Sequence, residues 1–372
     1  GREIPIFTNE FWTSKQRAAS SLHEVSYRAC FKPQLPRFFI ERLTRPGDVV
    51  YDPFMGRGTT LLEAVLLGRP AAGCDLNPLS IILLRPRLEV PELEQIRSRL
   101  EEIPWDSKEP LPEHLLVFYH PKTLRQICAL REAVNTGKSS VDRWIRMVAT
   151  NRLTGHSKGF FSVYTLPPNQ AVSIASQRRI NAQRNQIPPA REVAALIYRK
   201  SRSLLSRITE NDRATLARWG PRSLLLTGSC VAVPDIRDES VTLVVTSPPF
   251  LDVVNYETDN WLRCWFSGID PKTINLWMFR SVSEWSLQMT RVFRELHRIL
   301  QSGGFVAFEV GEVRHRKLKL ENFVIPAAEQ AGLKPLLVLV NQQKFTKTSN
   351  CWGVNNMSKG TNTNRVILLQ KQ

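Results

Sequence analysis

The sequence has few of the residues that bind metals or form disulfides. Its six cysteines and six histidines are scattered over 372 residues. No C-x-x-C pair occurs, and no histidine spacing is typical of a metal site. We therefore expect reduced thiols and no metal centre. The lack of an H-x-E and P-C-x-x-C set also excludes a zinc-dependent base deaminase.

Long apolar runs and acidic residues are scarce as well. No apolar stretch is long enough to span a bilayer, and no segment resembles a signal peptide, so we expect no membrane association. The expected location is intracellular: the cytoplasm or nucleoid of a bacterium, or the nucleus of a eukaryote. Lys and Arg number 51 against 34 Asp and Glu, a net charge of +17. Such an excess favours a polyanionic partner, usually nucleic acid.

A stiff turn follows the apolar, β-branched run 241–245, which predicts a buried strand. The turn reads Thr-Ser-Pro-Pro-Phe at 246–250. Two consecutive prolines stop the strand because neither has an N–H and each fixes its own φ. The turn would present the Ser247 hydroxyl, backbone carbonyls and an aromatic ring at the carboxyl edge of a sheet, where open α/β sheets bind ligands. A plain surface turn with two prolines is the alternative.

A second pattern is the strand–turn–helix segment 48–67. Its turn, Asp-Pro-Phe-Met-Gly-Arg-Gly-Thr-Thr at 52–60, contains two glycines, and Gly68 is the expected helix C-cap. Glycines at 56 and 58 let the backbone approach a ligand closely, and the helix N-terminus offers free N–H groups. The pattern predicts a cofactor loop.

A second strand, 71–75, ends in Asp75, about twenty residues beyond the glycine loop. Nucleotide-binding units of this kind place a carboxylate there to bind ribose hydroxyls. The third glycine of the NAD-binding G-x-G-x-x-G pattern is missing. Asp75 could also simply cap the helix that follows.

Together these motifs resemble those of the S-adenosylmethionine-dependent DNA amino-methyltransferases, over roughly 25–88 and 223–370. The resemblance implies an α/β fold with a Rossmann-like class I methyltransferase sheet, closed by an antiparallel hairpin at about 335–341 and 364–369. It implies a catalytic domain formed by 1–90 and 223–372. A mostly helical, basic insertion at 91–222 would recognise DNA.

The resemblance also implies site residues. The catalytic turn is Ser247, Pro248, Pro249 and Phe250. S-adenosylmethionine would contact Phe31, Pro33, Asp52, Pro53, Phe54, Gly56, Gly58, Thr59, Thr60, Asp75, Asn77, Ser229 and Thr246. The family usually has Gly-Asp where this sequence has Gly228-Ser229, which puts the adenine contact there in doubt. Arg178, Arg179, Arg184, Asn255 and Tyr256 are the expected DNA contacts.

The implied reaction is methylation of the N4 amino group of cytosine in DNA, because Ser247 stands where adenine-specific relatives mostly carry Asp or Asn. The base would be flipped out of a duplex, or the DNA would be single-stranded. N6-adenine DNA methylation and RNA amino-methylation are the alternatives. A nucleic-acid-binding protein that kept the fold without activity is a further one. No Pro-Cys dipeptide occurs, which excludes the nucleophile typical of cytosine-C5 methyltransferases.

Overall fold

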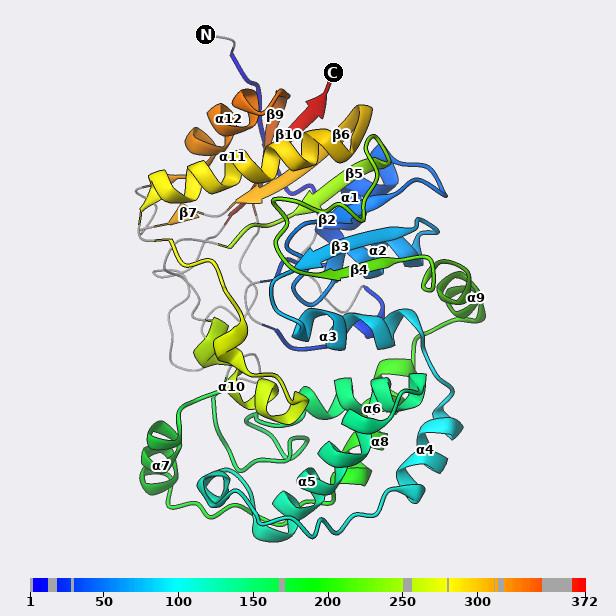
Figure 1. Cartoon of the computed structure of the whole chain (residues 1–372), viewed down its shortest axis with the longest axis vertical. Helices are drawn as coiled ribbons and strands as arrows, with labels where there is room; N and C mark the ends of the chain where they lie inside the picture. The colour runs from blue at the N-terminus through cyan, green and yellow to red at the C-terminus, as the bar shows by residue number, and fades with distance from the viewer. Residues whose placement is uncertain are drawn as a thin grey trace.

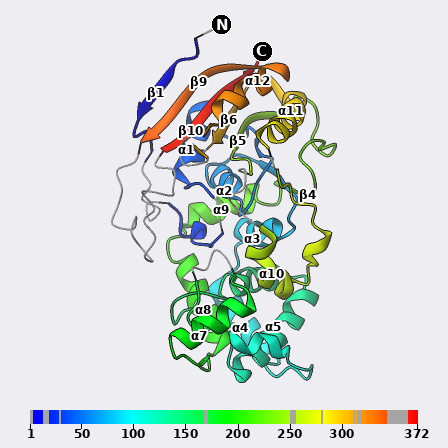
Figure 2. The same ribbon diagram turned by 90° about the vertical axis from the view of Figure 1, so that its left-hand side faces the viewer.

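The computed structural model describes residues 3–12, 19–27, 30–166, 171–249, 256–279, 281–310, 312–313, 318–342 and 363–372. They form a sheet with helices on both faces and a helical region at one end (Figures 1 and 2). The strands are β1 (Ile6–Asn9), β2 (Val50–Asp52), β3 (Ala71–Asp75), β4 (Leu224–Thr227), β5 (Val241–Thr246), β6 (Leu300–Val310), β7 (Glu312–Val313), β8 (Leu318–Lys319), β9 (Leu333–Gln342) and β10 (Thr363–Lys371).

The α-helices are α1 (Gln34–Leu43), α2 (Thr59–Leu66), α3 (Leu79–Leu88), α4 (Leu93–Glu102), α5 (Pro121–Thr136), α6 (Ser140–Thr150), α7 (Ile174–Gln183), α8 (Val193–Leu205), α9 (Glu210–Trp219), α10 (Tyr256–Ser267), α11 (Val282–Ile299) and α12 (Glu321–Gln330). Single 3-10 turns cover Ser21–His23, Glu113–Val117 and Pro271–Thr273.

The main sheet has the strand order β1-β9-β10-β6-β5-β2-β3-β4. Strands β6, β5, β2, β3 and β4 run parallel to one another. Strand β10 runs antiparallel to both β6 and β9. The chain goes from β2 outward to β3 and β4, then returns to place β5 on the other side of β2. This reversal makes a crevice beyond the carboxyl ends of β2 and β5, where such sheets bind ligands.

Alternating side chains of the strands fill two separate cores. Val50 and Leu243 pack with helices α1, α2 and α3 on one face, while Tyr51 and Val244 pack with α11 and α12 on the other. All four side chains are fully buried. Strands covered on both faces in this way are continuously apolar, which is why the runs at 49–51 and 241–245 were recognisable as strands.

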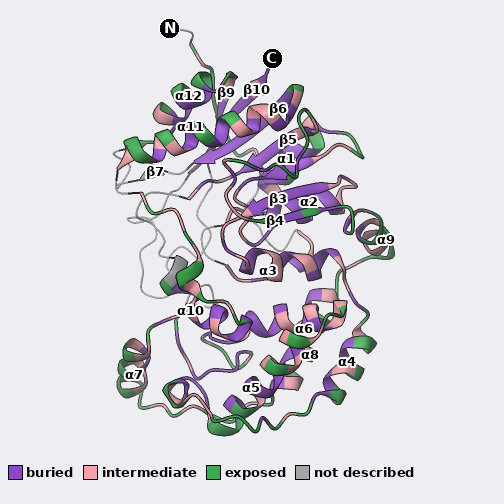
Figure 3. Ribbon diagram, in the orientation of Figure 1, coloured by how far each residue is buried: buried purple, intermediate pink, exposed green. Residues whose placement is uncertain are grey.

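The helices between β3 and β4 are arranged in two groups. Helices α4, α5, α6, α7 and α8 gather beyond α3 at the end of the molecule away from β9 and β10 (Figure 1). Helix α9 instead packs on α2 and α3, beside the sheet. The core that contains Trp144 of α6 is continuous with the α1–α3 side of the sheet, so both parts share one apolar interior. Helix α7 is mostly exposed (Figure 3).

The predicted α/β class and its closing antiparallel hairpin are confirmed by β9 and β10. The edge strand β1, which pairs parallel with β9 through Ile6 and Val338, lies outside the resemblance and was not predicted. Among the described residues no helix is long and apolar enough to cross a membrane. The described part of the chain also contains no group of three or more His, Cys, Asp or Glu placed to hold a metal ion.

Candidate active site

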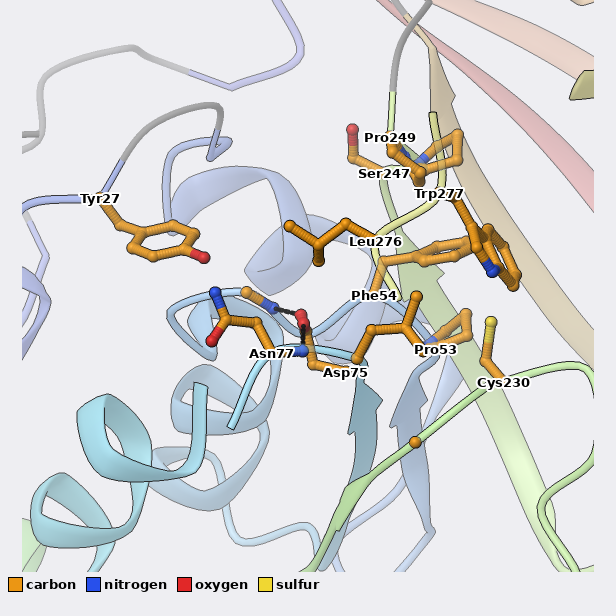
Figure 4. Close-up of a pocket in the computed structure, with 14 residues that line it drawn as sticks. Tyr27, Pro53, Phe54, Asp75, Asn77, Cys230, Ser247, Pro249, Leu276 and Trp277 are labelled. Carbon is orange, nitrogen blue, oxygen red and sulfur yellow. Dashed lines mark hydrogen bonds between the residues drawn. The ribbon is translucent and has the colours of Figure 1, made fainter. Parts of the chain in front are cut away.

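A cavity of about 750 Å³, partly open to solvent, lies at the carboxyl ends of the parallel strands. The residues that line it come from separate parts of the sequence (Figure 4). They are Tyr27, Pro53, Phe54, Gly56, Asp75, Leu76, Asn77, Gly228, Cys230, Ser247, Pro248, Pro249, Leu276 and Trp277. The glycine loop, the acid after β3 and the proline turn therefore face one space.

The glycine loop owes its shape to two left-handed residues. Gly56 has φ +48° and Gly58 has φ +76°, a region that side chains other than glycine rarely adopt. Gly58 is the N-cap of α2, and a Cβ there would lie 2.5 Å from Leu84. Gly56 faces the cavity, where a Cβ would have only ordinary contacts. Gly58 thus serves packing, whereas Gly56 leaves backbone open to a ligand.

Asp75 is held at the edge of the cavity by backbone donors. Its Oδ2 accepts the Gly56 N–H and its Oδ1 accepts the Asn77 N–H, each at 2.8 Å (dashed in Figure 4). Burial raises the pKa of the Asp75 carboxyl, and the two backbone hydrogen bonds partly oppose this shift. Asn77 in turn accepts the Leu79 N–H at 3.0 Å and so starts α3. The N-cap of α3 is Pro78, without a side-chain cap, so the alternative in which Asp75 caps this helix is wrong.

Two elements lie behind the proline turn. The Trp285 indole N–H, from α11, donates to the Pro249 carbonyl at 3.0 Å. Glu309, at the end of β6, lies near the Ser247 hydroxyl and accepts from the Asn364 amide of β10 at 2.8 Å. Burial raises the pKa of Glu309, while the nearby Ser247 and Asn364 oppose the rise.

Asp52 and Thr246 lie beneath the cavity and do not line it. The Thr246 hydroxyl donates to Asp52 Oδ1 at 2.6 Å, which joins the ends of β5 and β2. The Phe54 N–H donates to the same oxygen at 3.0 Å. Burial raises the pKa of Asp52 to about 7 despite these donors. The pair therefore supports the glycine loop from below.

Other residues predicted from the sequence are away from the cavity. Phe31 packs on the α1 side of the core, and the buried Pro33 is the N-cap of α1. The Thr60 hydroxyl donates to the Val245 carbonyl at 3.0 Å, and Thr59 accepts from Arg57 at 3.1 Å. The Ser229 hydroxyl accepts from the Val231 N–H at 3.5 Å, although its neighbours Gly228 and Cys230 line the cavity.

The predicted nucleic-acid contacts are described in part. Arg178, Arg179 and Arg184 are exposed on and just after α7, and the Arg184 guanidinium lies 3.8 Å from the centre of the Tyr164 ring. Phe250 and Asn255 lie outside the described residues, and Tyr256 is described only as the first residue of α10.

Several cavity residues were not predicted from the sequence. Tyr27 and Trp277 line opposite sides of the cavity in Figure 4, with Trp277 packed edge-on against Phe54 at 5.8 Å between ring centres. Leu276 and Cys230 complete the walls. Glu309 carries the one sequence signal that was available, an acid inside the otherwise apolar run 305–310. Trp277 has no local signal of this kind.

Comparisons with known proteins agree with this arrangement. Residues 5–81 match the family model for N6/N4 methyltransferases, described as DNA methylase. The type II methyltransferase M.BsoBI of Geobacillus stearothermophilus is 24% identical over 73% of this chain and 58% of its own length. M.MvaI of Kocuria varians is 23% identical over 61% of this chain and 52% of its own. The chain thus spans a little over half the length of these relatives.

Among solved structures, TrmN from Thermus thermophilus covers 93% of this chain and 50% of its own, with a TM-score of 0.37 and 14% identity. The family model covers the segment that contains the glycine loop and Asp75, and the relatives extend over most of the chain. The chain is therefore similar to DNA amino-methyltransferases, most specifically in the segment that holds the glycine loop and Asp75.

Proposed function

We propose that the protein transfers a methyl group from S-adenosylmethionine to the exocyclic N4 amino group of cytosine in DNA. One observation carries the proposal: Ser247, Gly56 and Asp75 face the same cavity. A methyl donor held by the glycine loop and an amino group held by the proline turn would therefore meet. The match of residues 5–81 to the N6/N4 methyltransferase family model supports an amino group as the acceptor.

The cavity fits S-adenosylmethionine. Asp75 keeps lone pairs for two ribose hydroxyls, since each of its oxygens accepts one backbone N–H. Leu76, Phe54 and Trp277 offer apolar walls for a base. When bound, S-adenosylmethionine supplies a sulfonium methyl group that is open to attack by a nucleophile.

The proline turn can prepare an amino nitrogen for methylation. The lone pair of such a nitrogen is delocalised into the ring, so the enzyme must hold its hydrogens out of the ring plane. We infer that Ser247 directs its own proton toward the neighbouring Glu309, which would leave the lone pairs of its oxygen free to accept an amino hydrogen. The Pro248 carbonyl on the same turn supplies a second acceptor. Trp285 holds the adjoining Pro249 carbonyl, so these acceptors are oriented before the substrate arrives.

The buried Glu309 carboxylate also supports charge development. Methylation makes the amino nitrogen positive, and a carboxylate one hydrogen bond behind Ser247 stabilises that charge in a site shielded from water. The nitrogen then loses a proton. Ser247 Oγ can receive it while passing its own proton to Glu309. Phe250, the aromatic residue of the predicted catalytic turn, lies outside the described residues.

The choice of N4-cytosine over N6-adenine rests on Ser247, at the position where adenine-specific relatives mostly carry Asp or Asn. DNA as substrate is supported by the match to the DNA methylase family model and by the net charge of +17. The helical region, with Arg178, Arg179 and Arg184 exposed, would contact phosphates. Because a paired amino group is inaccessible, the target base must be flipped out or single-stranded.

The test is incubation with S-adenosylmethionine labelled in its methyl group, using duplex DNA, single-stranded DNA and RNA in parallel. The modified nucleoside is identified after digestion. Labelled N4-methylcytosine from DNA is the expected product. N6-methyladenine would overturn the base assignment, and label in RNA alone would overturn the assigned substrate. The absence of transfer to all three would overturn the proposed activity.

A further inference from the structure

The short segment 23–27, here called the Tyr27 segment, carries one wall of the cavity. Tyr27 lines the cavity, and a Cβ built on Gly56 would lie 3.8 Å from its ring. The ring therefore covers the backbone of the glycine loop. The Tyr27 segment belongs to no helix or strand beyond His23, so side-chain contacts must determine its position.

One anchor of the Tyr27 segment comes from the glycine loop itself. The Arg57 guanidinium donates to the carbonyls of Val25 at 2.8 Å and His23 at 3.2 Å. Its Nε donates to Thr59 at 3.1 Å, and only 6% of Arg57 is exposed. Three buried hydrogen bonds thus join the Tyr27 segment to the start of α2.

Two more anchors come from distant parts of the chain and converge on Ser26. The Ser26 N–H donates to Asn151 Oδ1 at 2.8 Å, and Arg263 Nη2 donates to the Ser26 carbonyl at 3.0 Å. Asn151 is 3% exposed and Arg263 is 5% exposed. The Arg263 guanidinium also lies 5.7 Å from the centre of the Tyr27 ring. Both backbone groups of the residue before Tyr27 are therefore held by buried side chains.

Both of these side chains belong to the helical end of the molecule. Asn151 is the C-cap of α6, and Arg263 is on α10. The last carbonyls of α10 accept hydrogen bonds from α5 and α6. Arg131 donates to Trp265 O, Asn135 to Phe266 O and Arg146 to Ser267 O, at 3.0, 2.8 and 2.6 Å. Helix α10 is thereby fixed to the region proposed to contact nucleic acid.

We propose that Asn151 and Arg263 are positioning residues of the cofactor site, which hold Tyr27 over the glycine loop from the helical region. This rests on the proposed function, because the ligand that Tyr27 would cover is S-adenosylmethionine. Neither side chain lines the cavity, so each acts through Ser26 and Tyr27. The helical region then does more than contact nucleic acid, since it completes a wall of the cofactor site.

The test measures binding of S-adenosylhomocysteine by calorimetry to the whole chain and to matched variants. Asn151→Leu removes the acceptor of the Ser26 N–H at nearly constant volume, and we expect about tenfold weaker binding. Asn151→Asp keeps an oxygen acceptor and should restore the affinity to within about twofold. Arg263→Met, which removes the donor to the Ser26 carbonyl, should weaken binding as Asn151→Leu does.

A double-mutant cycle separates positioning from general destabilisation. If Asn151 acts through Tyr27, then Asn151→Leu should cause no further loss of affinity in a Tyr27→Ala background. Melting temperatures without ligand show which variants are folded. If Asn151→Leu does not fold, Arg263→Met takes its place in the binding comparison. Unchanged affinity in both folded variants, or fully additive losses with Tyr27→Ala, would overturn the positioning role of Asn151 and Arg263 but not the proposed function. Failure of the unmodified protein to bind S-adenosylhomocysteine would overturn the proposed function as well.

Discussion

Two successive hydroxyl residues at the end of β5 each lie beside a buried acid on a neighbouring strand. Thr246 donates to Asp52 at the end of β2, and Ser247 lies near Glu309, close to the end of β6. Because side chains alternate along a strand, the two hydroxyls leave β5 in different directions. Burial raises the pKa of both acids. Of the two hydroxyls, only that of Ser247 lines the cavity. Ser247 and Glu309 can therefore act on a substrate, whereas Thr246 and Asp52 support the loop beneath it.

Removing the Ser247 hydroxyl should affect catalysis more than cofactor binding. We expect Ser247→Ala to lower kcat by about 100-fold or more, the usual cost of losing one oriented polar group at a reacting centre. The affinity for S-adenosylhomocysteine should stay within about twofold. The comparison is Ser240→Ala, just before the opposite end of β5, where the hydroxyl bonds only to the Arg237 carbonyl. Lost cofactor binding in Ser247→Ala would contradict the assigned role.

Glu309 should control how activity depends on pH. Since Glu309 must be ionised to accept the Ser247 proton, kcat of the unmodified protein should fall as pH decreases through the raised pKa of Glu309. Glu309→Gln should lower kcat by about tenfold or more and remove this acid limb. The profile is measured by single-turnover methyl transfer from pH 5 to 8. Glu321→Gln, which alters a buried acid paired with Arg365 at 2.7 Å, should keep the limb.

Asp52 should make folding stability depend on pH. Its folded pKa of about 7 exceeds the ordinary value of 3.8, so the folded state binds more protons between these pH values. The free energy of unfolding should therefore fall as pH rises through this window, by up to about 1.4 kcal/mol per pH unit. Asp52→Asn keeps an acceptor for Thr246 and should flatten this slope. Urea titrations at pH 5, 6, 7 and 8 measure it, and equal slopes would refute the assignment.

Helix α11 helps to position the proline turn without lining the cavity itself. Helix α11 lies on the face of the sheet opposite α2, and its Trp285 reaches the Pro249 carbonyl. The indole is fully buried among residues of the second core. The prolines make the turn stiff by limiting φ, but the direction in which it points depends on α11. The stiffness of the turn thus comes from its own prolines, whereas its direction comes from the hydrogen bond to Trp285.

Trp285→Phe should weaken both the fold and the turn. We expect a stability loss of about 1–3 kcal/mol from the lost hydrogen bond and volume, and about tenfold lower kcat because the turn is no longer fixed. Trp144→Phe is the matched control. Trp144 is also fully buried and donates to Ser201 at 3.0 Å, but in the helical region. It should lose similar stability at full kcat, and equal kcat losses in both variants would contradict the role of α11.

At the scale of the whole molecule, exposed basic residues lie on the same side as the carboxyl edge of the sheet. A polyanion bound on that side would contact both. Helix α7 and the proline turn lie on the same side of the molecule in Figure 1, with α10 between them. Arg178, Arg179 and Arg184 are exposed there. Two partly buried arginines of the same region, Arg131 and Arg146, instead cap α10. The positive charge therefore serves two purposes, and only the exposed part is available to phosphates.

Neutralising the exposed arginines should reduce the salt dependence of DNA binding. The triple variant Arg178→Gln/Arg179→Gln/Arg184→Gln should lower the slope of log K against log[salt] by about 0.9 for each DNA phosphate that is no longer neutralised. Fluorescence anisotropy on a labelled duplex from low to moderate salt measures the slope. Arg42→Gln/Arg45→Gln/Arg218→Gln removes as many exposed charges from α1, the loop after it and α9 and should change the slope less. Equal changes would show that only net charge matters.

Much of the fold was determined by local sequence. The apolar runs at 49–51, 241–245 and 305–310 formed buried strands because strands covered on both faces must be continuously apolar. The glycines at 56 and 58 adopt the positive φ that their position in the turn requires. The proline pair ended β5 where expected, since proline cannot donate to a ladder. These features depend on residues within one turn or strand of each other, so the sequence alone was sufficient to predict them.

The rest of the site was decided only when the chain folded. Glu309 reaches Ser247 because β6 pairs with β5 in a register that places Phe308 opposite Thr246. Tyr27 depends on Asn151 and Arg263, more than 120 and 230 residues away. Trp277 enters the cavity from a loop with no regular pattern. No local periodicity records which distant side chains meet, because the whole packed core selects those contacts at once.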